Sequence, residues 1–446
     1  MFRKLIVLAS LAVLGACSSD KSATPPPAST SSPLTYYDDA LPIFEQHCLE
    51  CHQNGGIAPF RLDQYADAKL QSRAIVAALQ SREMPPWAAT SDGSCQNFSH
   101  SLALPDEDRQ TLTHWATSGA AEGTPRAVEL PSRPSLPDAT DFATPVFSPV
   151  AQGGDLAEFD EYRCFMLDPG IDDVRYITGY DVVPGTPSVI HHVLVSVVDP
   201  NAESDLDGMT NGEVMTALHA QSPDRDGWPC FGGAGDNVNV ESVPVAWAPG
   251  QGMVEYPGES GVPLVPGRRL VVQVHYNLAG NPGAITDQSI VRLRLASSVP
   301  NVGIVVLEDQ LLDTLFDGTP HALEPGKPSV TYGWQAHVSE YFGDLTDVKL
   351  YGVMPHMHQR GHKFRMNVSA GDTPTCGMDV QQWDFHWQHM YFYSQPLAVT
   401  PDTKIDVTCD FDTSSDTAPV LPGWGTRNEM CLAVMYFVVP AAELAQ

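Results

Sequence analysis

A Cys-X-X-Cys-His run lies near the start of the chain, at Cys48-Leu49-Glu50-Cys51-His52. Two thiols three positions apart can add across the vinyl groups of a porphyrin, and the following His can then face the iron. The run therefore predicts a covalent haem c that is attached at Cys48 and Cys51, with His52 as an axial ligand. A zinc site is the alternative, but no second Cys or His pair follows at zinc-ribbon spacing.

The second axial ligand of such a haem should be soft and should lie on a loop after the helices. Met84 fits, because the prolines of Arg82-Glu83-Met84-Pro85-Pro86-Trp87 stiffen the loop that carries its sulfur. A Met ligand raises the reduction potential and favours electron transfer, and it would block the open iron position that a peroxidase needs. His47, His100 and His114 are rivals, although each is more typical of a surface or packing residue.

Further His residues lie in the second part of the chain. His356 and His358 are two apart, so both imidazoles lie on one face of a strand and can converge on one ion. His191 and His192 are adjacent, and adjacent strand residues point to opposite faces, so they can share a metal only if the strand twists or ends there. His275 stands alone in an apolar strand, where a hydrogen-bonded core His is the commoner case.

Four short motifs together resemble the copper type II, ascorbate-dependent monooxygenases, a family that includes peptidylglycine α-hydroxylating monooxygenase and dopamine β-monooxygenase. The motifs are HHV, QVHY, HMH and NEMC, in family order between about residues 150 and 440. Bacterial members that are fused to a cytochrome c domain look more similar still. The resemblance implies an electron-transfer copper and a catalytic copper. Their ligands would be His191, His192 and His275 at the first, and His356, His358 and Met430 at the second.

The resemblance also implies supporting residues. Gln273 would orient a ligand of the first copper. The chain has nine cysteines, and six remain if Cys17 takes lipid and Cys48 and Cys51 take haem, which is an even number that suits disulfides in an exported protein. The implied pairs are Cys409 with Cys431, which would brace the loop of Met430, and Cys164 with Cys230; Cys95 and Cys376 remain, paired or free.

One departure from the family pattern concerns the substrate. Peptide-amidating members anchor a substrate carboxylate with an Arg two residues before the HxH pair, and they add an Asn and a Tyr just after the Met-Cys. This chain has Met354, Leu432 and Val434 at those places. An apolar lining argues against a peptidyl-glycine substrate and favours a less polar one.

These features predict a monooxygenase that hydroxylates a substrate C–H bond with O2. Electrons would come from a periplasmic protein or a small reductant, enter through the haem and pass to the first copper. The fused haem would replace or relay the reductant that the family uses. The competing hypothesis is a non-enzymatic electron-transfer or copper-handling lipoprotein, which would need only one intact metal site.

The sequence patterns around these residues predict helices in the first part of the chain and strands in the second part. Residues 37–125 are predicted to form a small all-α cytochrome c domain, and the Pro-rich residues 126–145 a linker. Short β-branched runs between Gly and Pro follow, which is typical of all-β sandwiches. The length exceeds one typical sandwich, so we expect two jelly-roll-like copper domains, at 146–297 and 298–446.

The first residues indicate export. Residues 1–17 have a basic start, a short apolar run and the ending Leu14-Gly15-Ala16-Cys17. This ending resembles the lipobox of bacterial lipoproteins and predicts a lipid on Cys17, while Ser18 favours sorting to the outer membrane. A plain secretory signal is the alternative. Residues 18–36 are rich in Ser, Thr and Pro and are predicted to be a flexible tether.

The charge of the chain excludes some partners. It has 54 acidic and 24 basic side chains, a formal charge of −30. Such an excess repels nucleic acid and anionic lipid. No later run is long and apolar enough to cross a bilayer as a helix. We therefore expect a periplasmic or cell-surface lipoprotein that touches the membrane only through its anchor.

Overall fold

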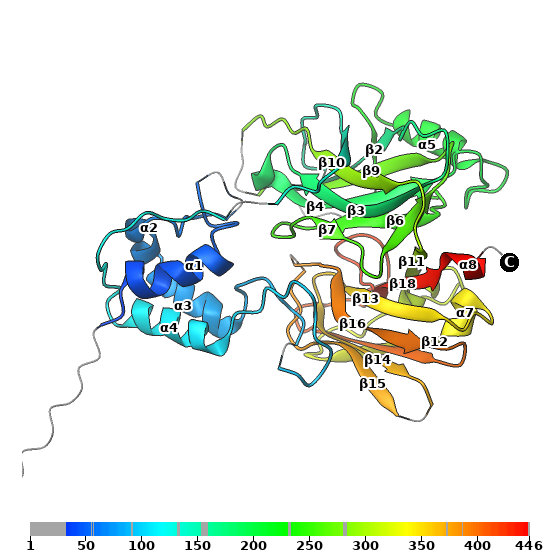
Figure 1. Ribbon diagram of the computed structural model, residues 1–446. Coiled ribbons are helices and arrows are strands. Elements are labelled where there is room, and N and C mark those ends of the chain that lie inside the picture. Colours follow the sequence, from blue (N-terminus) through cyan, green and yellow to red (C-terminus); the bar gives the residue numbers. More distant parts are fainter. Residues whose placement is uncertain are drawn as a thin grey trace, which may run out of the picture. The chain divides into compact units, whose positions relative to one another are not determined.

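The computed structural model consists mostly of β-sheets, with a group of helices near its N-terminus (Figure 1). The predicted lipid site, Cys17, lies outside the described residues. Among those residues, no helix combines the length and the apolarity that crossing a bilayer would require. The structure describes residues 33–444, apart from 55, 57, 91, 132–133, 153–158, 231–232, 280–282, 372 and 386.

The helical segment has a small apolar core of its own, in which Tyr36, Phe44 and Trp115 are fully buried and their rings are in contact. Asp106 and its two acidic neighbours lie in the first turn of the last helix. Their negative charges stabilise this helix by interacting with the positive end of its dipole. The Cys-X-X-Cys-His run begins directly after α1. The helices are η1 Tyr36–Ala40, α1 Leu41–His47, α2 Tyr65–Leu70, α3 Ser72–Ser81 and α4 Asp106–Thr117.

The first half of the strand-rich region is a sandwich. A five-stranded sheet of order β5-β2-β9-β4-β6 packs through Val193 and Val272 on Val182 and Leu293 of the facing sheet. Its elements are β1 Ala139–Ala143, β2 Asp160–Leu167, β3 Arg175–Val183, η2 Pro187–Val189, β4 Ile190–Val198, α5 Asn211–His219, β5 Trp228–Pro229, β6 Ser242–Trp247, β7 Val254–Glu255, β8 Ser260–Leu264, β9 Arg269–Asn277 and β10 Ile290–Ala296.

The second half is another sandwich. A four-stranded sheet of order β12-β17-β14-β15 packs through Phe364 and Val407 on Leu350 and Phe437 of the facing sheet. Its elements are β11 Asn301–Glu308, α6 Gln310–Asp313, β12 Val330–His337, α7 Val338–Phe342, β13 Val348–His356, β14 Gly361–Ser369, β15 Pro374–Val380, β16 Tyr391–Val399, β17 Lys404–Phe411, β18 Leu432–Pro440 and α8 Ala441–Leu444. The prediction of β sandwiches after residue 145 is confirmed.

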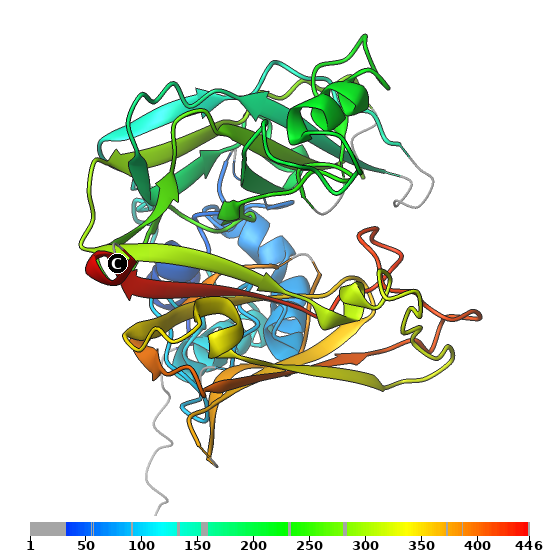
Figure 2. The ribbon, with the colours of Figure 1, turned by 90° about the vertical axis from the view of Figure 1, so that its right-hand side faces the viewer.

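One nine-stranded sheet runs through both halves, in the order β1-β10-β3-β8-β11-β18-β13-β16 with β7 beside β3. Figure 2 shows β18 beside β11, its antiparallel partner. Side chains of β18 alternate between two cores: Met435 and Phe437 face one, and Tyr436 and Val438 face the other. A central strand that is covered on both faces reads as a continuous apolar run, as LAVMYFVVP does. The predicted cut near residues 297–300 stays a prediction.

The segment 87–99 joins the helical segment to the second sandwich. Ala89 forms a β-bridge with Val380, and Phe98 forms another with Tyr393. Thr90 makes two hydrogen bonds of 2.8 Å to Asp379, one from its backbone N–H and one from its hydroxyl. The Cys95–Cys376 disulfide lies beside them. These contacts hold the loop after Met84 against the β-sheets.

Candidate metal centres

Three imidazoles converge between strands β4 and β9. One ring nitrogen from each of His191, His192 and His275 lies within 4.8 Å of the other two. The pairing of β4 with β9 shifts by one residue between Ile190 and His192, so a β-bulge falls at His191. Because a bulge re-aims a side chain, it lets two adjacent strand residues serve one site. This is the strand irregularity that the adjacent pair required.

Neighbouring side chains orient His275. Its Nε2 lies 3.3 Å from a carboxylate oxygen of buried Asp160, and its ring stacks on Tyr162 at 3.9 Å between centroids. A carboxylate at Nε2 favours the tautomer in which that nitrogen carries the proton. The lone pair of Nδ1 is then available for a metal. Asn277 also donates to Asp160, at 3.2 Å, and so holds the carboxylate in place.

We expect Asp160→Asn to lower the copper affinity of the three-His site by about 10- to 100-fold, as loss of an outer partner of a metal-bound His typically does. The amide can accept the Nε2 proton but lacks the charge that makes the imidazole more basic. Chelator competition would measure the affinity. Asp402→Asn, at an exposed position, is the matched control. Equal affinities in the two variants would contradict the role of Asp160.

Gln273 lies near this cluster, as the sequence suggested. Its Nε2 donates to the carbonyl of Gly233 at 2.8 Å. Burial is the main cause that lowers the pKa of His192 well below 6.5, and the positive charge of His275 or His356 would lower it further. An imidazole that stays neutral is ready to bind a metal.

His356 and His358 form a second pair at the end of β13, with ring centroids 5.1 Å apart. Nδ1 of His356 bonds the side-chain oxygen of Gln388, and Nδ1 of His358 lies 3.1 Å from the carbonyl of Asn428. Both partners accept, so each Nδ1 donates and each Nε2 keeps its lone pair. Burial lowers the pKa to about 4 for His356 and to about 3 for His358. Both rings therefore stay neutral at neutral pH.

Met430 comes to this pair through the pairing of β13 with β18. His356 pairs with Leu432, and Met430, two residues before Leu432, lines the same cavity as His356 and His358. Met430 is 2% exposed and packs on Met354, Leu432 and Val434. Two imidazoles and a thioether are thus available for one ion, and the thioether favours Cu(I).

Glu429, which the sequence analysis did not single out, connects the two parts of this second group. Its carboxyl oxygens accept the backbone N–H groups of His358, at 2.9 Å, and Arg360, at 2.7 Å. Burial raises the pKa of Glu429 to about 8, although these N–H groups lower it. Arg360 in turn pairs with Asp416 at 2.7 Å. The turn after β13 is thereby fixed to the residue before Met430.

Both His groups line a single cavity of about 330 Å³. His192 contributes from the first group, and His356, His358 and Met430 from the second. The ring of Phe385 lies between them, with centroids 5.5 Å from His191 and 6.0 Å from His358. Met354, Leu432 and Val434 line the same cavity, as do three acidic side chains, Asp205, Asp309 and Asp313. No Lys or Arg is among the described lining residues.

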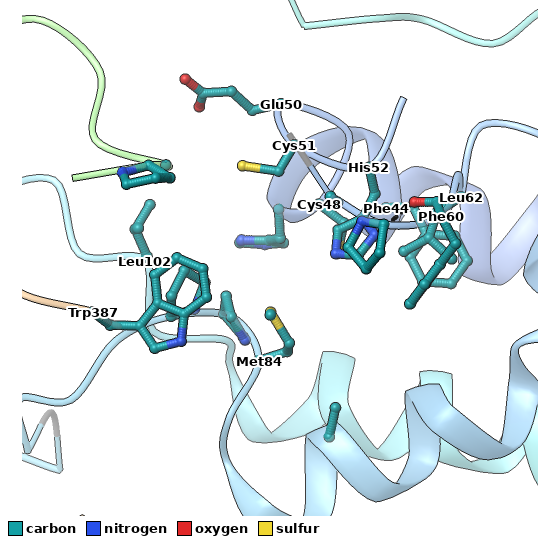
Figure 3. Close-up of a pocket in the computed structure, with 18 of the residues that line it drawn as sticks. Phe44, Cys48, Glu50, Cys51, His52, Phe60, Leu62, Met84, Leu102 and Trp387 are labelled. Carbon is teal, nitrogen blue, oxygen red and sulfur yellow. Dashed lines mark hydrogen bonds between the residues drawn. The ribbon is translucent and has the colours of Figure 1, made fainter. Parts of the chain in front are cut away.

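A separate apolar cavity of about 620 Å³ faces the Cys-X-X-Cys-His run (Figure 3). Cys48, Cys51, His52 and Met84 all line it, and Figure 3 shows Met84 across the cavity from the Cys residues. His191 lines it too, from the β region. Of the cysteines that the structure describes, only Cys48 and Cys51 are outside disulfides.

The geometry around His52 suits a metal ligand. Its Nδ1 lies 3.0 Å from the carbonyl oxygen of Phe60, so this nitrogen donates and Nε2 is left to bind. Of the rival His residues, His47 also lines the cavity, and it lies 3.6 Å from Asp108. His100 and His114 do not line it.

Three disulfides close within the described residues. Cys164–Cys230 and Cys409–Cys431 are the two pairs that the family resemblance implied. Cys409–Cys431 lies directly beside Met430. Cys95 and Cys376, which the sequence left open, form the third pair. Disulfides agree with an exported protein.

Residues 321–446 match the family described as copper type II ascorbate-dependent monooxygenase, C-terminal domain. DBH-like monooxygenase protein 1 of Mus musculus is 23% identical over 265 residues, which cover 57% of this chain and 40% of that protein. A Paenibacillus xanthan lyase structure aligns over 74% of this chain and 29% of that chain at 12% identity, but its TM-score of 0.15 carries no argument.

Two hydroxylases are also similar. Tyramine beta-hydroxylase of Caenorhabditis briggsae is 24% identical over 212 residues, which cover 45% of this chain and 34% of that protein. Dopamine beta-hydroxylase of Rattus norvegicus is 23% identical over 359 residues, which cover 76% of this chain and 53% of that protein. The chain thus spans between about a third and about half of the length of these relatives. Residues 321–446 thus match the C-terminal domain of the copper type II ascorbate-dependent monooxygenase family, and the chain is similar to members of that family beyond this domain.

Proposed function

We propose that this protein is a copper-dependent monooxygenase that hydroxylates a C–H bond of an apolar substrate with O2. The observation that carries the proposal is the cavity at which both His groups meet, one of three His and one of two His and a Met. Copper bound there would supply one-electron redox chemistry and activate O2. The hydroxylases among the relatives support the same reaction class.

The chain's own residues prepare the two sites. Burial keeps His192, His356 and His358 neutral, so no proton competes with copper near neutral pH. Gln388 and Asn428 hold the two imidazoles of the second site by their Nδ1 atoms. Glu429 holds the backbone of the turn at His358 and Arg360. The two imidazoles of the second site are therefore held in place before any metal arrives.

The cavity wall supports an apolar substrate. Met354, Leu432 and Val434 stand where peptide-amidating relatives place groups that bind a carboxylate, and they pack together around Met430. The charged lining residues described are all acidic, which disfavours an anionic substrate and suits a neutral or cationic one. The substrate is thus a small apolar or aromatic compound rather than a peptidyl-glycine.

The proposal includes a haem c in the helical segment, which forms the cytochrome domain. The apolar cavity, the two thiols outside disulfides, His52 with Nε2 available and Met84 across from it fit a covalent haem with His and Met ligands. Such a haem would supply a one-electron carrier of raised potential. Electrons from an external donor would enter there. The same proposal includes export of the protein and a lipid on Cys17. The protein would then lie in the periplasm or be anchored to the outer membrane.

Met84→Ala is expected to keep the covalent haem and both coppers, but to lose most turnover that is supported by a protein electron donor. Without the thioether, the iron loses its strong-field sixth ligand and its raised potential. Metal analysis, the haem spectrum and product formation measure these outcomes. Turnover with a small reductant that reaches copper directly is the control and should persist. Undiminished turnover with the protein donor would remove the haem from the electron route.

The function itself is tested by oxygen uptake. Copper-loaded, reduced protein is mixed with O2 and with apolar and aromatic compounds, and hydroxylated product is identified by its mass. Two coppers and one iron per chain with substrate-dependent oxygen uptake are the expected result. One copper per chain and no oxygen uptake would instead favour the non-enzymatic electron-transfer or copper-handling protein.

A further inference from the structure

The segment 383–390 contacts all three candidate cofactor sites. Trp387 lines the cavity of the haem motif, together with Cys51 and Met84 (Figure 3). The next residue, Gln388, lines the copper cavity and bonds Nδ1 of His356. One peptide bond thus separates a side chain at the haem cavity from a side chain that holds a candidate copper ligand.

Other residues of the segment reinforce this path. Trp383 donates from its indole N–H to the carbonyl of His358 at 3.2 Å. The ring of Phe385 stacks on the ring of His191 and makes an edge contact with the ring of His358. Its backbone carbonyl accepts a hydrogen bond from Gln388 Nε2 at 2.8 Å. The backbone N–H of Trp387 donates to the carbonyl of Asp384 at 3.1 Å. Trp383, Phe385 and Gln388 are thus held by contacts to the candidate ligands themselves.

We propose that Trp387 and Gln388 form an electron path from the haem to the second copper, which bypasses the three-His copper. This inference rests on the proposed function. In the step, ferrous haem loses one electron and becomes ferric, and Cu(II) held by His356, His358 and Met430 gains it and becomes Cu(I). The covalent link Trp387–Gln388 and the hydrogen bond to His356 carry it. His191, which lines the haem cavity directly, serves the first copper instead.

The path has a physical rationale. Electron tunnelling decays more slowly along covalent and hydrogen bonds than across empty space. From Trp387 to His356 every step is a bond, whereas a route through the first copper must then cross the cavity between the two groups. Trp387 and Gln388 are therefore positioning residues for electron delivery. They do not bind substrate in this proposal.

The test follows haem oxidation in the full-length protein. A His275→Ala chain, which lacks a ligand of the first copper, is prepared with ferrous haem and Cu(II) in the second site, and the haem absorbance is recorded after rapid mixing. Trp387→Leu in this background is expected to slow haem oxidation by roughly tenfold or more. Trp387→Phe should restore part of the rate. Leu70→Ala, at an exposed position of α2, is the control and should leave the rate unchanged.

Further readouts separate this role from a structural one. Haem content, copper content and both midpoint potentials should be the same in Trp387→Leu as in its parent. Gln388→Leu should slow the transfer as well, and the double variant should be no slower than the slower single variant, because both lie on one path. An unchanged rate in Trp387→Leu, or additive losses in the double variant, would overturn the proposal.

Two outcomes concern the underlying function. A chain with no covalent haem, or with no copper in the second site, overturns the proposed function and this inference together, and metal analysis detects it before any kinetics. If His275→Ala does not fold, freeze-quenched electron paramagnetic resonance of Cu(II) in the unaltered cluster gives the same comparison of Trp387→Leu with its parent. Equal rates there would overturn the electron path alone.

Discussion

Glu429→Ala is expected to lower the free energy of unfolding by about 3 to 5 kcal/mol and to remove copper from the second site. Glu429 is fully buried, and its oxygens accept the N–H groups of His358 and Arg360. Alanine leaves both N–H groups buried without an acceptor, at about 1 to 3 kcal/mol each. It also leaves the turn that carries His358 without its attachment to the segment before β18 that carries Met430.

Urea unfolding of the metal-free protein measures the first effect, and copper titration the second. Glu429→Gln should lose less, because its amide oxygen still accepts one N–H while its amide nitrogen faces the other. Glu107→Ala, at an exposed position of α4, is the matched control. If Glu429→Ala were as stable as this control and still bound two coppers, the two N–H groups would have other partners and Glu429 would not brace the site.

The spacing of residues predicted part of the site, because that part follows from strand geometry. His356 and His358 are two apart, which places both on one face of β13, and the structure has both rings at the end of that strand. The adjacent pair His191 and His192 needed a strand irregularity that no residue type announces. The bulge depends on the register of β4 against β9, which only the folded sheet fixes.

The supporting residues were harder to predict, since they act across long sequence distances. Asp160 reaches His275 only because β2 lies beside β9, where Tyr162 pairs with His275. Gln388 bonds His356 across 32 residues of chain, which no local pattern indicates. Glu429 was visible within the NEMC motif, yet its role needs the turn at Arg360. An acid directly before the candidate ligand Met430 was the signal that the sequence offered.

The division of the chain shows the same limit. The pattern of apolar residues indicated helices before about residue 125 and strands after 145, because apolar residues recur with different periods in helices and in strands. It did not indicate that β8 pairs in parallel with β11 across the expected domain boundary. Nor did it indicate that the segment 87–99 forms β-bridges with strands of the second sandwich. In both cases a strand or loop pairs with a strand that is distant in sequence. Such pairing depends on tertiary contacts and not on the local sequence pattern.

His275→Ala and His356→Ala are each expected to lower copper from two ions per chain to one, and to abolish hydroxylation. Each substitution removes a direct ligand, so the loss should exceed the 10- to 100-fold typical of outer partners. The two variants should differ in what remains. His275→Ala keeps the second site, which can still be reduced and bind O2, whereas His356→Ala keeps only the three-His site.

Copper and iron per chain, product yield and haem spectrum measure these outcomes, with His114→Ala on the surface of α4 as the control. Haem content should be unchanged in all three variants, because Cys48, Cys51 and His52 are untouched. Loss of both coppers from either variant would show one cooperative site instead of two. Two coppers retained in His275→Ala would contradict the three-His site, and hydroxylation that survives in His356→Ala would place the reacting oxygen elsewhere than beside His358 and Met430.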